Sequence, residues 1–243
     1  MFNSSKQKKK KFSIRSFVTR MFLFLLLSVF ALELFYIARI ALFAFIDPSS
    51  TPYMRQEEDR LSENAPHSVR YSWVDYDKIS PYMKSAVVAA EDANFMHHNG
   101  LQWGAILTAA QRNLLSERHA PGGSTLTQQT IKNLFLSHDR SYFRKIQEII
   151  LAPIVEALWS KKRILEVYLN IAEFGNGIFG VEAASRAYFH KSASQLNRNE
   201  AIRLASILIN PKKYHINSNS SLIQRRVHRI ANDMRLVDIP KNK

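Results

Sequence analysis

The chain has 243 residues, of which 46% are hydrophobic and 22% charged, a balance typical of a globular protein and not of a disordered one. No cysteine is present, which excludes disulfides, thiolate metal sites and a cysteine nucleophile. The formal net charge of +14 indicates an anionic partner: phospholipid head groups, a pyrophosphate or nucleic acid.

The N-terminus combines a basic tail with an apolar segment. Residues 1–20 carry seven basic side chains and no acidic one, and residues 21–46 are apolar apart from a few positions that include Glu33 and Arg39. Because about 20 helical residues span the hydrocarbon core of a bilayer, residues 21–46 are predicted to form a transmembrane helix. The alternative, a buried core helix, is disfavoured by the basic flank.

The same segment predicts the topology of the protein. Basic residues before a first span stay in the cytoplasm, so the tail 1–20 is expected in the cytoplasm and everything after Ile46 on the outer side of the bacterial inner membrane. No small-residue cleavage site ends the apolar segment. We therefore expect a retained anchor and not a cleaved signal peptide.

The remaining residues are expected to form a juxtamembrane linker, 47–67, and one domain, 68–243. The linker is polar and contains proline and serine, which favours a loop. Ser80 before Pro81 is a helix-start signal, and Thr125 opens a capping-box pattern. No Asn-Gly turn between alternating runs is recognised, so the domain is expected to be mainly helical. Helices are predicted to begin near positions 80, 125, 144, 160, 180 and 199, with a kink or interruption at Pro153.

A first cluster with chemical potential is residues 89–100. Glu91 ends an apolar helix beside aromatic residues and histidines, a position where partial burial suits a general base. The alternative is an ordinary solvated Glu-Asp pair at a helix end. His97 and His98 do not have the spacing of a helical zinc pair, so no metal site is predicted there.

A second cluster, residues 121–135, has two glycines followed by hydroxyl residues and a helix start. Free backbone N–H groups at such a helix start favour an anion. The Gly-Lys-Ser/Thr ending of a nucleotide-binding loop is absent, and Lys132 is expected to add a positive charge for a phosphate. The alternative is a turn followed by a well-capped helix.

The third cluster, residues 139–150, contains Arg140, Arg144 and Glu148. Arg144 and Glu148 are four residues apart, which on a helix allows an ion pair. Taken alone, such a pair indicates only a surface helix.

Together the clusters resemble glycosyltransferase family 51, the peptidoglycan transglycosylases. The resemblance covers about residues 68–215 and includes a further block, 161–189. Three motifs of the family occur in order and are matched by Glu91, Asp92, Phe95, His98 and Gly100, by the run 122–129 with Lys132, Asn133 and Leu134, and by Arg144, Lys145 and Glu148.

This resemblance implies a mainly α, lysozyme-like glycosyltransferase domain behind a single transmembrane helix. It implies an enzyme that joins the lipid-linked growing glycan to the GlcNAc 4-hydroxyl of lipid II, with inversion, to form β-1,4 bonds. Glu91 is then the general base and Glu148 a second carboxylate. The substrate-binding residues that it implies are Ser124, Thr125, Gln129, Lys132, Asn133 and Arg140. The residues that it implies hold the architecture are Asp92, Phe95, His98 and Arg144.

Partners implied by the resemblance are lipid II, the nascent glycan strand and the bilayer, with cell-division or elongation proteins as a further class. Some relatives use Mg²⁺ or Mn²⁺, but the sequence shows no ligand cluster for either ion. No Ser-x-x-Lys transpeptidase signature follows the matched region, so a monofunctional polymerase is expected. The apolar residues of the segment 101–115 contact either lipid or the core.

Two motifs compete with this interpretation. The run 175–180 satisfies the Gly-x-Gly-x-x-Gly dinucleotide pattern, but the stretch before it is expected to be helical and not a strand of a parallel sheet. Asp75 and Asp77 mimic the Asp-x-Asp metal motif of nucleotide-sugar transferases, and we interpret them as part of an ordinary solvated segment.

Three other functions remain as alternatives. A lytic transglycosylase or muramidase would also use one leading glutamate, but it would leave the Gly-Gly-Ser-Thr and Lys-Asn cluster unexplained. A membrane-tethered scaffold without turnover is disfavoured by the presence of both Glu91 and Glu148. A nucleic-acid binder is disfavoured because the most basic segment is expected in the cytoplasm, separate from the folded domain.

Overall fold

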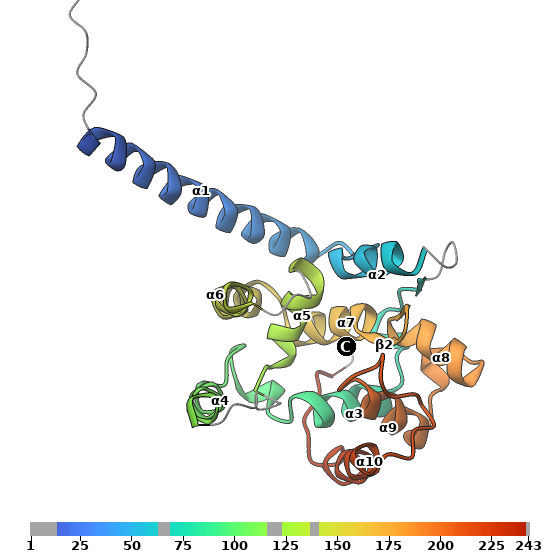
Figure 1. Cartoon of the computed structure of the whole chain (residues 1–243). Helices are drawn as coiled ribbons and strands as arrows, with labels where there is room; N and C mark the ends of the chain where they lie inside the picture. The colour runs from blue at the N-terminus through green and yellow to red at the C-terminus, as the bar shows by residue number, and fades with distance from the viewer. Residues whose placement is uncertain (1–13, 63–68, 116–122, 137–140, 242–243) are drawn as a thin grey trace, which may run out of the picture. The chain divides into compact units, whose positions relative to one another are not determined.

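The fold is mainly helical, as predicted. The computed structural model describes residues 14–62, 69–115, 123–136 and 141–241 (Figure 1). These ranges contain ten α-helices and three short strands. Contacts divide the chain into two units, residues 1–39 and 40–243.

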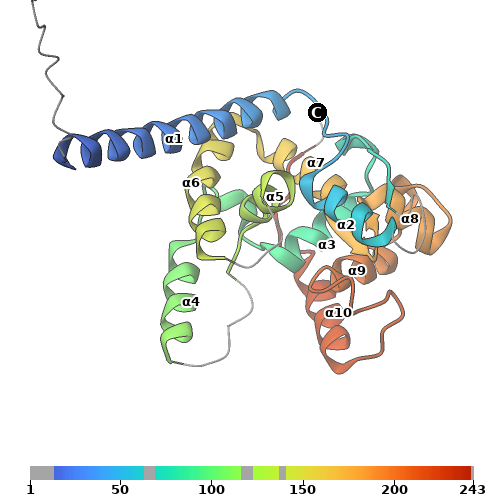
Figure 2. The ribbon, with the colours of Figure 1, turned by 45° about the horizontal axis from the view of Figure 1, so that its top comes forward.

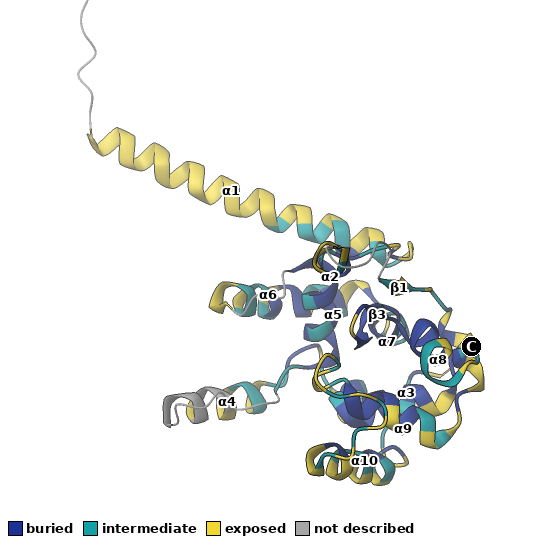
Figure 3. Ribbon diagram, turned by 45° about the vertical axis from the view of Figure 1, so that its right-hand side comes forward, coloured by how far each residue is buried: buried dark blue, intermediate teal, exposed yellow. Residues whose placement is uncertain are grey.

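Helix α1 (Ile14–Phe43) has 30 residues and is the one helix of the described ranges long and apolar enough to cross a membrane. It is exposed over most of its length (Figure 3). It starts before the apolar segment 21–46 because residues 14–20 contain no glycine or proline that would end a helix. Residues 21–43 of the predicted segment are thus part of a longer helix, which ends three residues before the predicted end at Ile46.

Helix α2 (Pro52–Ser62) lies in the segment expected to be a linker, 47–67. It is part of the folded unit, because Tyr53 is buried and its hydroxyl donates to Glu173 Oε2 at 2.5 Å. The polar composition of this stretch conceals the helix, since its buried polar residues find partners far along the chain.

Two groups of helices make up the core of the unit 40–243. Helices α3, α9 and α10 pack on one another, and α5 packs on both α6 and α7 (Figure 2). Helix α7 is buried on almost every side, as expected for a helix surrounded by core. The bounds are α3 Pro81–Glu91, α5 Leu126–Phe135, α6 Tyr142–Leu158, α7 Lys161–Ile171, α9 Arg198–Ile207 and α10 Ser221–Asp233.

The helix-start signals of the sequence are confirmed. Pro81 opens α3 after Ser80, Thr125 forms a complete capping box at α5, and the Ser160 hydroxyl accepts from Arg163 N at 3.1 Å. Helix α6 continues through Pro153, which is exposed, so the helix is not interrupted there. Helices α4 (Trp103–Leu115) and α8 (Val181–Phe189) complete the set together with three short 3-10 segments, Tyr76–Lys78, Phe95–His97 and Ala193–Gln195.

A small sheet that the sequence did not predict joins distant parts of the chain. Strands β2 (Glu173–Gly175) and β3 (Ile178–Phe179) are antiparallel, and β1 (Arg70–Tyr71) pairs in parallel with β3. The turn between β2 and β3 is Asn-Gly, with Gly177 at a φ of 69°, a conformation that glycine adopts freely. The expectation of no Asn-Gly hairpin is wrong, because strands of two and three residues are too short to show alternation.

Candidate active site

The carboxylate of Glu91 lies at the C-terminal end of α3 and is held by donors from two other helices. Its Oε2 accepts a hydrogen bond from Gln129 Nε2 of α5 at 2.9 Å, and its Oε1 pairs with Arg226 Nη2 of α10. The side chain is 12% exposed. A carboxylate so held is fixed in direction, while each oxygen keeps a further lone pair for another donor.

The amide of Gln129 is oriented by a third helix. The Tyr168 hydroxyl of α7 donates to Gln129 Oε1 at 3.1 Å, which leaves the Nε2 group to face Glu91. Burial holds the pKa of the Tyr168 hydroxyl well above its usual range, and the charge of Glu91 raises it further. Tyr168 therefore stays a donor at all working pH values.

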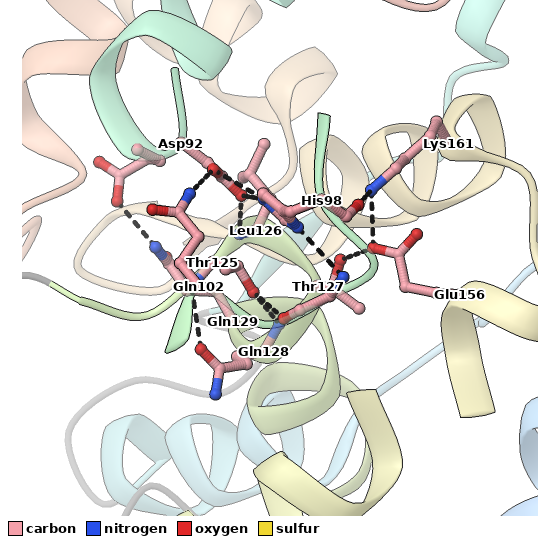
Figure 4. A network of polar contacts seen from close by, with 12 residues as sticks. Asp92, His98, Gln102, Thr125, Leu126, Thr127, Gln128, Gln129, Glu156 and Lys161 are labelled. Carbon is pink, nitrogen blue, oxygen red and sulfur yellow. Dashed lines mark hydrogen bonds and ion pairs between the residues drawn. The ribbon is translucent and has the colours of Figure 1, made fainter. Parts of the chain in front are cut away.

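Asp92 connects the loop after α3 to the start of α5 (Figure 4). Its carboxylate is buried and accepts hydrogen bonds from His98 Nε2 at 2.9 Å, Gln102 Nε2 at 2.7 Å and Leu126 N at 2.9 Å. His98 Nδ1 accepts from Gly100 N at 3.1 Å, so the ring proton resides on Nε2, where it donates to Asp92. A negative charge at the first turn of α5 is also favoured by the helix dipole.

Two of the backbone N–H groups at this helix start are bound from within the chain, Leu126 N by Asp92 and Gln128 N by the Thr125 hydroxyl. Thr125 was expected to bind substrate, but it is buried, and its hydroxyl donates to Gly100 O at 2.7 Å while accepting from Gln128 N. Leu126 N donates to the carboxylate of Asp92. An acid of the same chain that already lies at the helix start binds there without the entropy cost of binding a separate anion. Thr125 thus has the contacts of a supporting residue.

Glu148 of α6 is buried between two cations. Its Oε1 accepts from Arg144 Nη1, and its Oε2 accepts from Lys145 Nζ at 2.9 Å. Lys145 Nζ also donates to Ser124 Oγ at 2.8 Å. The expected pairing of Arg144 with Glu148 is present, and the contact with Ser124 joins the second cluster of the sequence to the third.

Lys132 of α5 is the cation between the two carboxylate systems. Burial lowers the pKa of its ammonium group, whereas the negative charges of Glu148 and Glu91 act to raise it. A desolvated ammonium group is suited to an anionic ligand.

Two further predicted residues have simpler surroundings, and a third lies outside the described residues. Phe95 is fully buried, and Lys161 Nζ lies 4.6 Å from its ring centroid. Asn133 is buried on α5, and Arg140 lies outside the described residues. Lys161 also donates to Glu156 and to His98 O (Figure 4), which fixes the loop that carries the first motif.

Other features of the described ranges lie away from this arrangement. A surface cavity of about 590 Å³ is lined by residues that include Trp73, Asp75 and Asp77, but by none of the predicted catalytic residues. Asp75 pairs with Lys78 and Asp77 with Lys162, which agrees with the solvated interpretation of that segment. Within the described residues no three His, Asp or Glu side chains form a group able to hold a metal ion.

Comparison with known proteins agrees with the motifs. The sequence profile of a family described as Transglycosylase matches residues 57–235. The chain belongs to this transglycosylase family. It is 46% identical over 213 residues to a Biosynthetic peptidoglycan transglycosylase of Bordetella pertussis, covering 86% of this chain and 88% of that protein. Proteins with the same description from Azoarcus sp. (strain BH72) and Thiobacillus denitrificans are 46% identical over 220 residues and 48% identical over 196 residues, covering 88% and 80% of this chain and 95% and 84% of those proteins.

Three residues of this transglycosylase site were missed from the sequence. Lys145 stands inside a matched motif, and Tyr168 lies on the apolar face of a predicted helix, so both had a local signal. Arg226 lies outside the motifs. Its one signal is its position between Ile223 and Ile230, which are the buried residues of α10.

Proposed function

We propose that this transglycosylase polymerises the glycan strands of peptidoglycan, with lipid II as the acceptor and the lipid-linked growing strand as the donor. The observation that carries the proposal is the electrostatic coupling of Lys132 to the carboxylates of Glu91 and Glu148. A base is needed at one end of the reaction and a cation beside the departing pyrophosphate at the other. In this site a fixed carboxylate and a desolvated ammonium group are electrostatically coupled.

In the proposed reaction Glu91 removes the proton of the GlcNAc 4-hydroxyl of lipid II. The hydroxyl oxygen forms a bond to C1 of the donor MurNAc while the bond from C1 to the undecaprenyl pyrophosphate breaks. Attack from the opposite face converts the α linkage into a β-1,4 linkage. The pyrophosphate leaves with its extra negative charge stabilised by Lys132 and by Arg140, which lies outside the described residues.

The second carboxylate has a positioning role in this scheme. Glu148 holds Arg144 and Lys145, and through Lys145 it holds Ser124. The positive charges of Arg144 and Lys145 lower the pKa of Lys132, and the negative charge of Glu148 acts to raise it. We infer that Glu148 keeps this cluster of positive groups together at the donor pyrophosphate without itself touching the acceptor hydroxyl.

We also propose that α1 anchors the enzyme in the inner membrane, with residues 1–20 in the cytoplasm and the domain outside. Both substrates carry polyprenyl tails that stay in the bilayer, so the site must work at the membrane surface. Large apolar side chains are exposed on α4 and α6, where Trp103 is 61% and Phe143 86% exposed. Aromatic side chains of this kind suit a lipid interface.

Polymerisation of labelled lipid II tests the proposal. The purified protein in detergent should give long glycan chains on a gel, and lysozyme should digest them. Glu91→Gln should lower the rate by about 10²- to 10⁴-fold, the range for a general base. Asp59→Asn, which neutralises an exposed carboxylate on α2, is the matched control and should behave as the wild type.

Three results contradict the proposal. The folded wild type gives no polymer, the Glu91→Gln protein gives undiminished polymer, or the enzyme shortens preformed glycan instead of extending it. The last result would identify a lytic enzyme.

A further inference from the structure

Arg226 occupies a position of α10 where an apolar residue is expected. Helix α10 begins after Ser220, whose hydroxyl accepts from Ile223 N, and packs on α3 and α9 (Figure 2). Its buried residues are Ile223 and Ile230. Arg226 follows the first by three residues and precedes the second by four, so it lies on the same face of the helix.

The guanidinium is buried against the Glu91 carboxylate. The Arg226 side chain is 11% exposed, and its Nη2 pairs with Glu91 Oε1. Its Nε is buried without a hydrogen-bond partner among the described residues. Removing a guanidinium from water and leaving one donor unsatisfied both oppose folding. Stability alone therefore does not account for this residue, because Ile223 and Ile230 already fix the helix.

The other groups around Glu91 do not supply the same effect. Gln129 of α5 and Tyr168 of α7 are neutral. Lys132 of α5 interacts with Glu91 only through its charge, which it shares with Glu148 of α6. Within the described ranges Arg226 is the one cation that forms an ion pair with Glu91.

We propose that Arg226 is a positioning residue for the transfer reaction, which aims the free lone pairs of Glu91 at the acceptor hydroxyl. The proposal rests on the proposed role of Glu91 as the general base. A general base must lie within hydrogen-bond reach of the proton that it removes. The guanidinium of Arg226 at Oε1 and the amide of Gln129 at Oε2 together fix the plane of the carboxylate.

Arg226→Gln and Arg226→Lys separate this role from a structural one. Gln is neutral, whereas Lys keeps the charge but loses the planar fork of donors. Arg225→Gln is the matched control, because Arg225 is exposed on the same helix. The kcat and KM of lipid II polymerisation are measured for each full-length protein, and folding is checked by circular dichroism and thermal unfolding.

We expect Arg226→Gln to lower kcat at neutral pH by about 10- to 100-fold, the range for groups that orient a catalytic one. KM for lipid II should change less than kcat, because the residue orients the base and does not bind the substrate. Arg226→Lys keeps a donor for Oε1 and should recover part of the lost kcat, and Arg225→Gln should match the wild type throughout.

Two outcomes overturn the proposal. Wild-type activity in Arg226→Gln removes any role for the residue. Equal losses of kcat in Arg226→Gln and Arg226→Lys, together with a lowered unfolding temperature in both, assign it to the architecture alone. Glu91→Gln is measured in parallel, because high activity in that protein refutes the base itself, whereas an inactive Glu91→Gln beside a fully active Arg226→Gln refutes only the proposal on Arg226.

Discussion

Removing the carboxylate of Asp92 should separate the loop of the first motif from helix α5. In Asp92→Ala three donors lose their acceptor at once: His98 Nε2, Gln102 Nε2 and Leu126 N. His98 cannot compensate by moving its proton, because Nδ1 accepts from Gly100 N and a proton there would face that N–H. The first turn of α5 also loses its negative charge.

The magnitude follows from these contacts. A buried donor without an acceptor costs about 1–3 kcal/mol, and a charge at a helix start contributes about 0.3–1 kcal/mol, or somewhat more when buried. Gln102 is partly exposed and can turn to water, so two donors carry most of the loss. We expect the free energy of unfolding of Asp92→Ala to be lower by about 3–5 kcal/mol.

Asp92→Asn removes the charge of Asp92 but keeps its hydrogen-bonding shape. The asparagine oxygen still accepts from Leu126 N and His98 Nε2, and the Gln102 amide can rotate so that its oxygen accepts from the new NH₂ group. The loss is then limited to the charge, about 1–2 kcal/mol. Urea unfolding followed by circular dichroism, in detergent, measures both variants against Asp59→Asn as the exposed control. The reasoning is refuted if Asp92→Ala stays within about 1 kcal/mol of the wild type, or if Asp92→Asn is as unstable as Asp92→Ala.

Two further predictions concern buried charges. Lys132→Met should abolish polymerisation yet raise the free energy of unfolding at neutral pH by about 0.5–2 kcal/mol. Burial lowers the pKa of Lys132, so the folded state is penalised while the ammonium is charged, and the gain should shrink as the wild-type residue deprotonates at high pH. Glu57→Gln should lower the free energy of unfolding at neutral pH by about 1–3 kcal/mol. Burial alone would raise the pKa of Glu57, but hydrogen bonds from Arg60 and Lys212 outweigh it and hold the pKa below 4.5, so the difference should disappear as the pH falls through that lowered value.

Thermal unfolding over a range of pH, with the lipid II gel assay for the lysine variant, measures both. A lower unfolding temperature for Lys132→Met at neutral pH would contradict the first prediction. A destabilisation of Glu57→Gln that persists unchanged at strongly acidic pH would contradict the second.

The sequence by itself determined the features that depend on neighbouring residues. The helix starts at Pro81 and after Thr125 were predictable because a first-turn proline and a capping box are signals contained within a few residues. The long apolar helix was predictable because transfer into a bilayer depends on composition and length. The motifs around Glu91 and Glu148 identified the chemistry, since they are contiguous in the chain.

The tertiary structure decided which of these residues meet and which do not. Arg226 pairs with Glu91 across 135 positions, and Asp92 caps α5 across 34, so that part of the helix start expected to bind an anion is bound by the chain itself. Helix α2 was missed for a similar reason, because its buried polar residues pair with distant segments. The Asn-Gly hairpin was missed because its strands are too short to show alternation. An ion pair or a buried carboxylate is stabilised by the groups that packing brings around it, and neither hydrophobic periodicity nor capping patterns encode those groups locally.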